Sequence, residues 1–166
     1  MKQDIILCGV GGQGIISIAN VIDNAAMKDG LNFKQAEVHG MSQRGGAVQS
    51  NLRLSDGRIW SDIIPRGGAD IVLSVEPLEA LRYLDYLKPD ASIIINEEEI
   101  YPPSVNLGDA KYPEHIDEMI RRHFRTVKMV DGPGIARAAG NSRAVNTALL
   151  GVLANFLSIQ SAVWEK

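Results

Sequence analysis

The stretch that decides the fold reads Asp4-Ile5-Ile6-Leu7-Cys8-Gly9-Val10-Gly11-Gly12-Gln13-Gly14. Its first half is a short, continuous apolar run, which is typical of a strand buried on both faces, as in a parallel sheet covered by helices. Apolar residues then recur at helical spacing from Ile15 to Ala26, and Gly30 suits the position just after a helix end. The order of strand, glycine turn and helix therefore predicts an α/β fold.

The glycine turn matches the pattern G-x-G-x-x-G and supplies the first candidate site residues, which are Gly9, Gly11, Gly12, Gln13 and Gly14. In one interpretation, the glycines let the backbone approach a phosphate, which then meets the unpaired amides and positive dipole end of the helix N-terminus. In the other, the turn only lets the helix pack closely against the strand. The motif by itself leaves both interpretations open.

A second strand is expected from Phe33 to His39, and Glu37 lies roughly where a nicotinamide-binding domain places its ribose-binding acid. The usual crossover helix does not follow. Residues 47–60 instead alternate between apolar and polar side chains, and Ser55-Asp56-Gly57-Arg58 is a turn signal. We therefore expect a β-hairpin within residues 47–60, in place of the second crossover helix.

The rest of the chain continues the α/β alternation, so the expected architecture is a three-layer sandwich with a mostly parallel, Rossmann-like sheet and an inserted β-hairpin. One domain spans residues 1–166, and the helical pattern that starts at Ser158 stops midway, which suggests a truncated C-terminal tail. The final long helix is expected to be capped by Asn141 or Ser142. The remaining expected elements are strands at 70–75, 91–95 and 126–130 and helices at 77–87, 113–124 and 132–139.

The segment from Glu37 to Gly46 is the part of the chain that packing alone does not explain. Polar residues and glycines are concentrated there between two apolar strands, which costs stability unless the loop contacts another group. We therefore interpret it as the functional face of the protein. Its candidate cofactor-binding or partner-facing residues are Glu37, His39, Gly40, Met41, Ser42, Gln43, Arg44, Gly45 and Gly46.

Composition excludes several classes of function. The 166 residues carry a formal net charge of −3 with no long basic run, so nucleic acid is not an expected partner. The single cysteine, Cys8, excludes an intrachain disulfide and a cysteine-ligated iron–sulfur cluster. No apolar run approaches the length of about 18 residues that a membrane span needs, and no signal peptide is evident, so a cytoplasmic protein without a membrane partner is expected.

Three blocks together resemble one family. They are residues 9–14, the segment from Glu37 to Gly46 with Val48 and Ser50 after it, and residues 70–79 with their Glu76-Pro77-Leu78-Glu79 motif. They are similar to the gamma subunit, or gamma domain, of the 2-oxoacid:ferredoxin oxidoreductases, and most similar to the beta subunit of indolepyruvate:ferredoxin oxidoreductase. The His39-to-Gly46 block is the more specific signal, and the resemblance covers nearly the whole chain as one pyruvate/ketoisovalerate oxidoreductase gamma-type domain.

This resemblance implies an enzyme that converts a 2-oxoacid, coenzyme A and oxidised ferredoxin to an acyl-CoA, carbon dioxide and reduced ferredoxin. Thiamine diphosphate, magnesium and iron–sulfur clusters carry the chemistry in such enzymes. The chain shows no motif for any of them, so we expect no catalytic residue, metal site or cofactor on this chain alone. A large partner subunit would carry them, and Arg44 is a candidate to meet a phosphate or carboxylate there.

Two other functions remain open from the residues alone. The glycine turn with Glu37 would also suit an NAD(P)-dependent Rossmann dehydrogenase. A nucleotide-binding module without catalysis is the third interpretation. The particular 2-oxoacid and the oligomeric state are not specified by the sequence.

Overall fold

The computed structural model describes residues 1–39 and 46–164. It contains one six-stranded sheet in the order β2-β3-β1-β4-β5-β6. The strands are β1 (Lys2–Val10), β2 (Asn32–His39), β3 (Ala47–Ser55), β4 (Ala69–Ser74), β5 (Leu87–Asn96) and β6 (Thr126–Val130). The α-helices are α1 (Ile15–Lys28), α2 (Pro77–Arg82), α3 (Pro103–Asn106), α4 (Ile116–Arg121), α5 (Gly132–Ala138), α6 (Val145–Ala154) and α7 (Ser161–Trp164), and a 3-10 helix spans Leu84–Tyr86.

The sheet is mostly parallel, as expected. Strands β1, β4, β5 and β6 run parallel to one another, whereas β3 pairs antiparallel with both β1 and β2. The inserted hairpin is therefore present, but it does not lie within residues 47–60, where it was expected. It consists of β2 and β3. The turn signal at Asp56-Gly57 directly follows β3, and the next strand, β4, begins only at Ala69.

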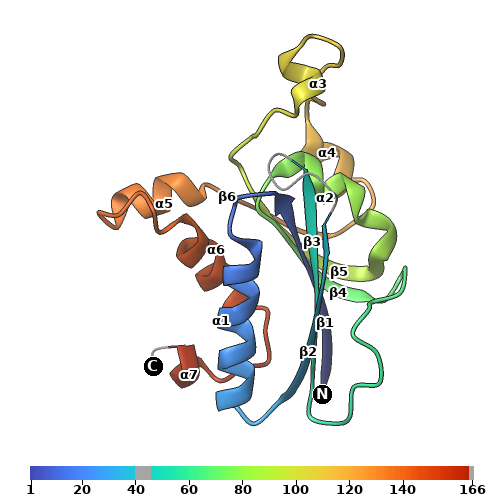
Figure 1. The fold of residues 1–166 in the computed structure, drawn as a ribbon, viewed down its shortest axis with the longest axis vertical. Coiled ribbons are helices and arrows are strands. Elements are labelled where there is room, and N and C mark those ends of the chain that lie inside the picture. The colour runs from blue at the N-terminus through green and yellow to red at the C-terminus, as the bar shows by residue number, and fades with distance from the viewer. Residues whose placement is uncertain (40–45, 165–166) are drawn as a thin grey trace.

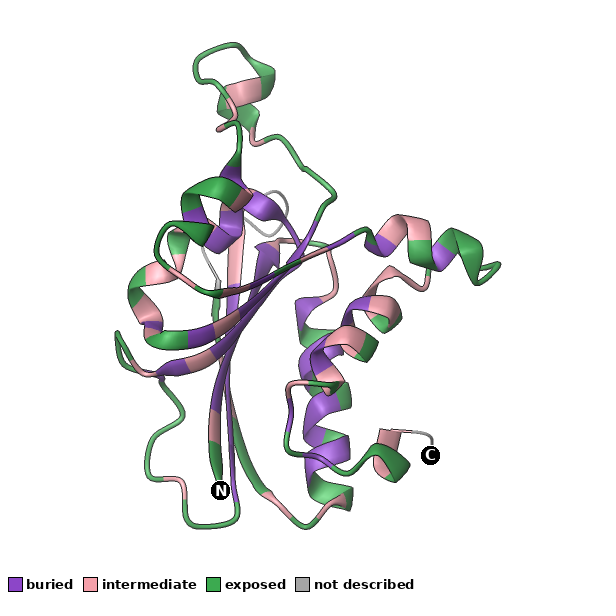
Figure 2. Ribbon diagram, turned by 180° about the vertical axis from the view of Figure 1, so that it is seen from behind, coloured by how far each residue is buried: buried purple, intermediate pink, exposed green. Residues whose placement is uncertain are grey.

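Helices cover both faces of the sheet and complete a three-layer sandwich (Figure 1). Side chains alternate along β1, so Ile5 and Leu7 join one core with α1 and α6. Ile6 and Cys8 join a second core on the opposite face, with residues of α2 and α4. Figure 2 shows the consequence for α1, whose buried residues form one stripe of the helix while the rest of its surface is exposed.

Gly30 ends α1 in the expected way. It adopts φ 76°, and the Leu31 amide reaches back to the Ala26 carbonyl at 2.9 Å. These are the left-handed residue and the long backbone hydrogen bond of a Schellman-type helix end. Glycine is suited to this position because it has no side chain to clash in a left-handed backbone.

Three expected helices differ from the structure. The helix expected over 113–124 is shorter, since α4 spans only Ile116–Arg121. The helix expected over 77–87 ends at Arg82, because the chain enters β5 at Leu87, before Pro89 rather than after it.

The last long helix is not capped by Asn141 or Ser142. Ala144 occupies the N-cap position without a side-chain cap, and the Asn141 side chain accepts a hydrogen bond from the Arg143 amide at 3.0 Å. The expected helix end and the expected N-cap were therefore both wrong.

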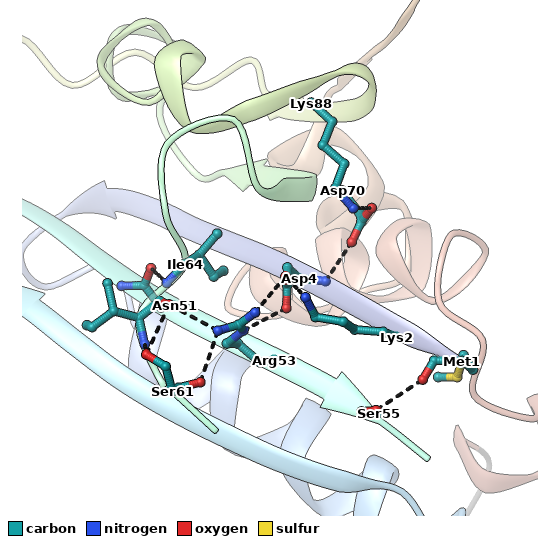
Figure 3. A network of polar contacts seen from close by, with 11 residues as sticks. Met1, Lys2, Asp4, Asn51, Arg53, Ser55, Ser61, Ile64, Asp70 and Lys88 are labelled. Atoms are coloured by element: carbon teal, nitrogen blue, oxygen red, sulfur yellow. Dashed lines mark hydrogen bonds and ion pairs between the residues drawn. The ribbon is translucent and has the colours of Figure 1, made fainter. Parts of the chain in front are cut away.

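The second face of β3 is polar and yet buried, and an ion pair organises it (Figure 3). Arg53 donates to both carboxylate oxygens of Asp4, at 2.8 and 3.0 Å. Its remaining nitrogen donates to the carbonyls of Ser61 and Ile63, both at 3.1 Å. Burial by itself would raise the pKa of Asp4, but the hydrogen bonds from Arg53 and Lys2 outweigh it and hold that pKa below its usual value.

No helix within the described ranges 1–39 and 46–164 is both long and apolar enough to cross a lipid bilayer.

Candidate functional site

The glycine turn after β1 is filled by a side chain of its own. The Gln13 amide oxygen accepts from the Val10 amide at 2.7 Å, and its nitrogen donates to the Val75 carbonyl at 3.3 Å. A Cβ at Gly9 would lie 2.8 Å from that Gln13 oxygen and 3.0 Å from the Ile15 side chain. Gly9 is therefore required for the close packing of helix against strand.

Two asparagines extend this arrangement across the same edge of the sheet. Asn146 at the start of α6 donates to the Gln13 carbonyl at 2.9 Å. Asn96 at the end of β5 donates to the Val75 carbonyl at 3.1 Å and accepts from the Gly132 amide at 3.2 Å. Three side-chain amides thus satisfy backbone groups where β1, β4 and β5 end, and they join those strands to α1, α5 and α6.

The other glycines of the turn have different roles. Gly14 adopts φ 77°, and a Cβ there would lie 2.7 Å from the Asn146 amide nitrogen. Gly12 adopts φ 102° with open space beside it, so its backbone faces the exterior of the turn. The packing interpretation of the turn is thus supported at Gly9 and Gly14. The first-turn amides of α1 lack intrahelical partners by helix geometry, so binding of an anion at Gly12 stays a prediction.

The two glycine-bearing segments meet at this edge. The Gly11 amide donates to the carbonyl of Gly46 at 2.8 Å. His39 is the last residue of β2 and pairs with Val48 of β3, so the segment between His39 and Gly46 starts and ends at the edge that carries the glycine turn. Six of the predicted site residues lie outside the described residues, namely Gly40, Met41, Ser42, Gln43, Arg44 and Gly45.

Glu37 does not lie where a dinucleotide-binding domain needs it. It is exposed on β2, pairs with Ser50 and accepts a hydrogen bond from the Gln35 side chain at 2.9 Å. Because β3 lies between β1 and β2, Glu37 is two strands from the glycine turn, or roughly 9–10 Å across the sheet. In a Rossmann dehydrogenase these two strands are neighbours, so the topology disfavours that alternative.

A hollow of about 260 Å³ lies at the opposite end of the sheet, whereas one of about 190 Å³ opens beside the glycine turn. Val10 and Ala47 form the wall of the smaller hollow on the strand side, and exposed Ile100 and Tyr101 lie on the other side. Glu76 and Glu79 of the Glu-Pro-Leu-Glu motif line it as well. We call this edge, with residues 9–14, Gly46 and the smaller hollow, the glycine rim.

The two glutamates of the rim are buried but unequally satisfied. Glu76 accepts from the Glu79 amide at 3.0 Å, from the Tyr112 hydroxyl and from the Ile100 amide. Glu79 accepts from Arg82 at 3.0 Å through one oxygen, and its other oxygen has no hydrogen-bond partner among the described residues. Burial raises the pKa of Glu79. The rim therefore contains one buried carboxylate oxygen without a hydrogen-bond donor in the described part of the chain, which is an unfavourable arrangement.

Sequence reasoning did not assign site roles to Asn96, Asn146 or the two glutamates. One signal was available for Glu76, since an acidic residue directly before a proline suits a helix N-cap, and its side chain does cap α2. No comparable signal marked Asn96, because its partners are distant in the sequence: Val75 directly follows β4, and Gly132 begins α5.

Cys8 is part of the core. Its thiol is fully buried and donates to the Ser74 hydroxyl at 3.3 Å, and burial raises its pKa to about 12. A thiol in this environment is not a nucleophile at neutral pH.

Comparison with known proteins identifies the class. Residues 4–166 match the model of the pyruvate ferredoxin/flavodoxin oxidoreductase family, and the chain belongs to that family, as an accessory subunit of a 2-oxoacid:ferredoxin oxidoreductase. The indolepyruvate oxidoreductase subunit IorB of Archaeoglobus fulgidus is 43% identical over 162 residues, which cover 96% of this chain and 79% of the relative. The IorB subunit of Pyrococcus horikoshii is 41% identical over 157 residues, which cover 92% of this chain and 77% of the relative. The resemblance expected from the three sequence blocks is confirmed.

Solved structures show the same fold. The gamma subunit of a keto/oxoacid ferredoxin oxidoreductase from Geobacter sulfurreducens aligns with a TM-score of 0.68 at 21% identity, over 98% of this chain and 82% of that one. The 2-oxoglutarate:ferredoxin oxidoreductase of Magnetococcus marinus, solved with 2-oxoglutarate, coenzyme A and succinyl-CoA bound, aligns with a TM-score of 0.72 at 17% identity. The alignment covers 99% of this chain and 26% of that longer chain. The expected three-layer fold is confirmed.

Proposed function

We propose that this chain is the accessory subunit of an indolepyruvate-type 2-oxoacid:ferredoxin oxidoreductase. The observation that carries this proposal is the 43% identity to the subunit IorB of Archaeoglobus fulgidus over 96% of this chain. The complex converts a 2-oxoacid, coenzyme A and oxidised ferredoxin to an acyl-CoA, carbon dioxide and reduced ferredoxin. The large partner subunit supplies thiamine diphosphate, magnesium and the iron–sulfur clusters, and electrons leave the complex on ferredoxin.

The glycine rim is the surface that faces this partner in the proposal. Ligands of open α/β sheets bind beyond the carboxyl ends of the strands, and the rim lies at that edge. The hydrogen bond from Gly11 to Gly46 brings both glycine segments to one place. Exposed Ile100 and Tyr101 add an apolar border beside the hollow. Such a border is suited to burial against another chain.

At this rim, the residues from His39 to Gly46 and the amides near Gly12 shape the entrance for coenzyme A or the 2-oxoacid. Arg44 supplies the planar guanidinium that a phosphate or carboxylate prefers. The Magnetococcus marinus enzyme, solved with coenzyme A bound, supports the use of that cosubstrate in this class of protein. Catalysis remains with the partner's cofactors.

The test is reconstitution of the chain with its large subunit, followed by measurement of complex formation and of acyl-CoA production from indolepyruvate. Arg44→Ala and Tyr101→Ala are expected to lower acyl-CoA formation or weaken assembly. Val21→Ala is the matched control, because Val21 is also exposed but lies on α1, outside the rim. Normal assembly and normal turnover in both rim variants would refute the assignment of this surface. Saturable micromolar NADH binding by the chain alone would favour a dehydrogenase instead.

A further inference from the structure

The segment that follows β3 exposes apolar side chains, although its backbone is hydrogen-bonded to β3. We call residues 56–66 the strap. Arg53 donates hydrogen bonds to the carbonyls of Ser61 and Ile63, and the Asn51 side chain accepts one from the Ile64 amide at 3.3 Å (Figure 3). Ile64 is completely buried. In contrast, Trp60 is 78% exposed and Ile63 is 48% exposed. The anchored backbone thus presents a large aromatic side chain to the exterior.

Two adjoining hollows lie at the strap, and the Trp60 side chain lines one of them. One has a volume of about 260 Å³ and includes Lys2, Arg58 and Trp60 in its walls. The other, of about 300 Å³, runs onto the edge strand β2 and includes Lys34. The two hollows share Arg58 and Ile59 in their walls, so they adjoin each other, and we call the two together the depression. The Arg58 guanidinium lies 4.0 Å from the centre of the Trp60 ring, in cation–π contact.

The depression is electropositive although the chain as a whole carries a net charge of −3. Its walls contain the cationic side chains of Lys2, Arg53, Arg58 and Lys34, against the carboxylates of Asp4 and Asp56. Both carboxylates already form ion pairs within the chain. Asp4 binds Arg53 and Lys2, and Asp56 binds the N-terminal amino group.

Two cations of the depression are therefore left for another molecule. Lys34 and Arg58 are exposed and pair with no carboxylate among residues 1–39 and 46–164. An exposed tryptophan with an adjacent unpaired arginine has the composition of an interface hot spot. Oppositely charged surfaces also accelerate association and select the partner.

We propose that this depression docks a carboxylate-rich segment of the large catalytic subunit, as a second contact in addition to the glycine rim. The proposal rests on the function proposed above. Lys2 lies at the start of β1 and Gly11 follows its end, so the two contacts are at opposite ends of the sheet. Arg58 and Lys34 would form charge-assisted hydrogen bonds with the partner's carboxylates, while Trp60 would be buried against its apolar atoms.

The experiment measures the dissociation constant between the chain and the purified large subunit at low and at high salt. Trp60→Ala and Arg58→Glu are each expected to weaken binding roughly tenfold, and the loss in Arg58→Glu should shrink at high salt. Met27→Ala and Arg122→Glu are matched controls, because both residues are exposed and lie outside both hollows. The controls should bind like the wild type. Circular dichroism and urea unfolding verify that all variants fold.

The outcomes separate the two proposals. If the wild type binds the large subunit and Trp60→Ala and Arg58→Glu bind it equally well, the docking surface is refuted and the proposed function stands. If the wild type does not bind the large subunit, the proposed function fails and this surface fails with it. Binding of a single-stranded oligonucleotide that Arg58→Glu abolishes, together with unchanged affinity for the large subunit, would assign the depression to nucleic acid and refute the proposal.

Discussion

Replacement of Arg53 by methionine should cost the protein about 3–5 kcal/mol of unfolding free energy, the usual effect of removing one partner of a buried ion pair. The Arg53 side chain is 11% exposed and that of Asp4 is 2% exposed. Without the guanidinium, the Asp4 carboxylate stays buried with only the more exposed Lys2 as its counterion. The carbonyls of Ser61 and Ile63 also lose their donor, so the strap loosens.

Urea unfolding followed by circular dichroism measures this cost. Lys2→Met is the control: it removes the other cation bound to Asp4, but Lys2 is 57% exposed, so the expected cost is about 0–1 kcal/mol. The double variant Asp4→Leu/Arg53→Met should lose less than Arg53→Met alone, because it leaves no buried charge unpaired. A loss below about 1 kcal/mol in Arg53→Met, or a double variant less stable than the single one, would refute this reasoning.

The same ion pair predicts a pH dependence. The pKa of Asp4 is held below its usual value in the folded protein, so its contribution is fully present above about pH 4, the usual carboxylate value. That contribution is lost as the pH falls through the lowered pKa. In Arg53→Met the main group that lowers this pKa is gone, so acid should destabilise the variant less steeply than the wild type. Equal slopes of unfolding free energy against pH below pH 4 would contradict the assignment.

Three further variants test other parts of the structure by urea unfolding. Gly14→Ala should lower the unfolding free energy by about 2–3 kcal/mol, because the new Cβ would lie 2.7 Å from the Asn146 side chain on a backbone with φ 77°. Gly12→Ala should lower it by only about 1 kcal/mol, because open space surrounds its Cβ. Equal losses in the two variants would exclude the contact with Asn146 as the cause. Asp23→Asn should stabilise the protein by about 1–2 kcal/mol at pH 7, after allowance for solvent screening, since burial raises the pKa of Asp23 to about 6 and one oxygen has no partner among the described residues. This gain in stability should vanish as the pH falls to about 4, where Asp23 is already protonated in the folded protein. The prediction would be contradicted by a gain that persists at that pH. It would also be contradicted by an equal gain in Asp109→Asn, the control at an exposed aspartate.

The strand, glycine turn and helix at the start of the chain were predicted accurately because their signals are local. A continuous apolar run, a cluster of glycines and a 3.6-residue apolar period describe β1, the turn and α1 without knowledge of distant residues. The Glu37–Gly46 and Glu76–Glu79 motifs were sufficient to identify the family for the same reason. Each motif is a short, contiguous pattern.

The position of the hairpin was not predictable in this way. The turn signal at Asp56-Gly57 is strong, yet it ends β3 and leads into the strap. Its usual outcome is overridden because Arg53 and Asn51 bind the strap's backbone and bury Ile64 in the second core. These tertiary contacts override the local preference of a two-residue turn.

The sequence by itself determined the class of fold, the strand–turn–helix unit at the start of the chain and the membership of the family, since each depends on periodicity or on contiguous motifs. Only the tertiary structure decided that Gln13 fills the glycine turn, that β3 separates Glu37 from that turn, and that Lys34 and Arg58 lie in one electropositive depression. The physical reason is that these arrangements depend on strand order and on side chains from distant segments. Residues such as Lys2 and Arg58 are far apart in the chain, and the pairing of β1 with β3 brings them together.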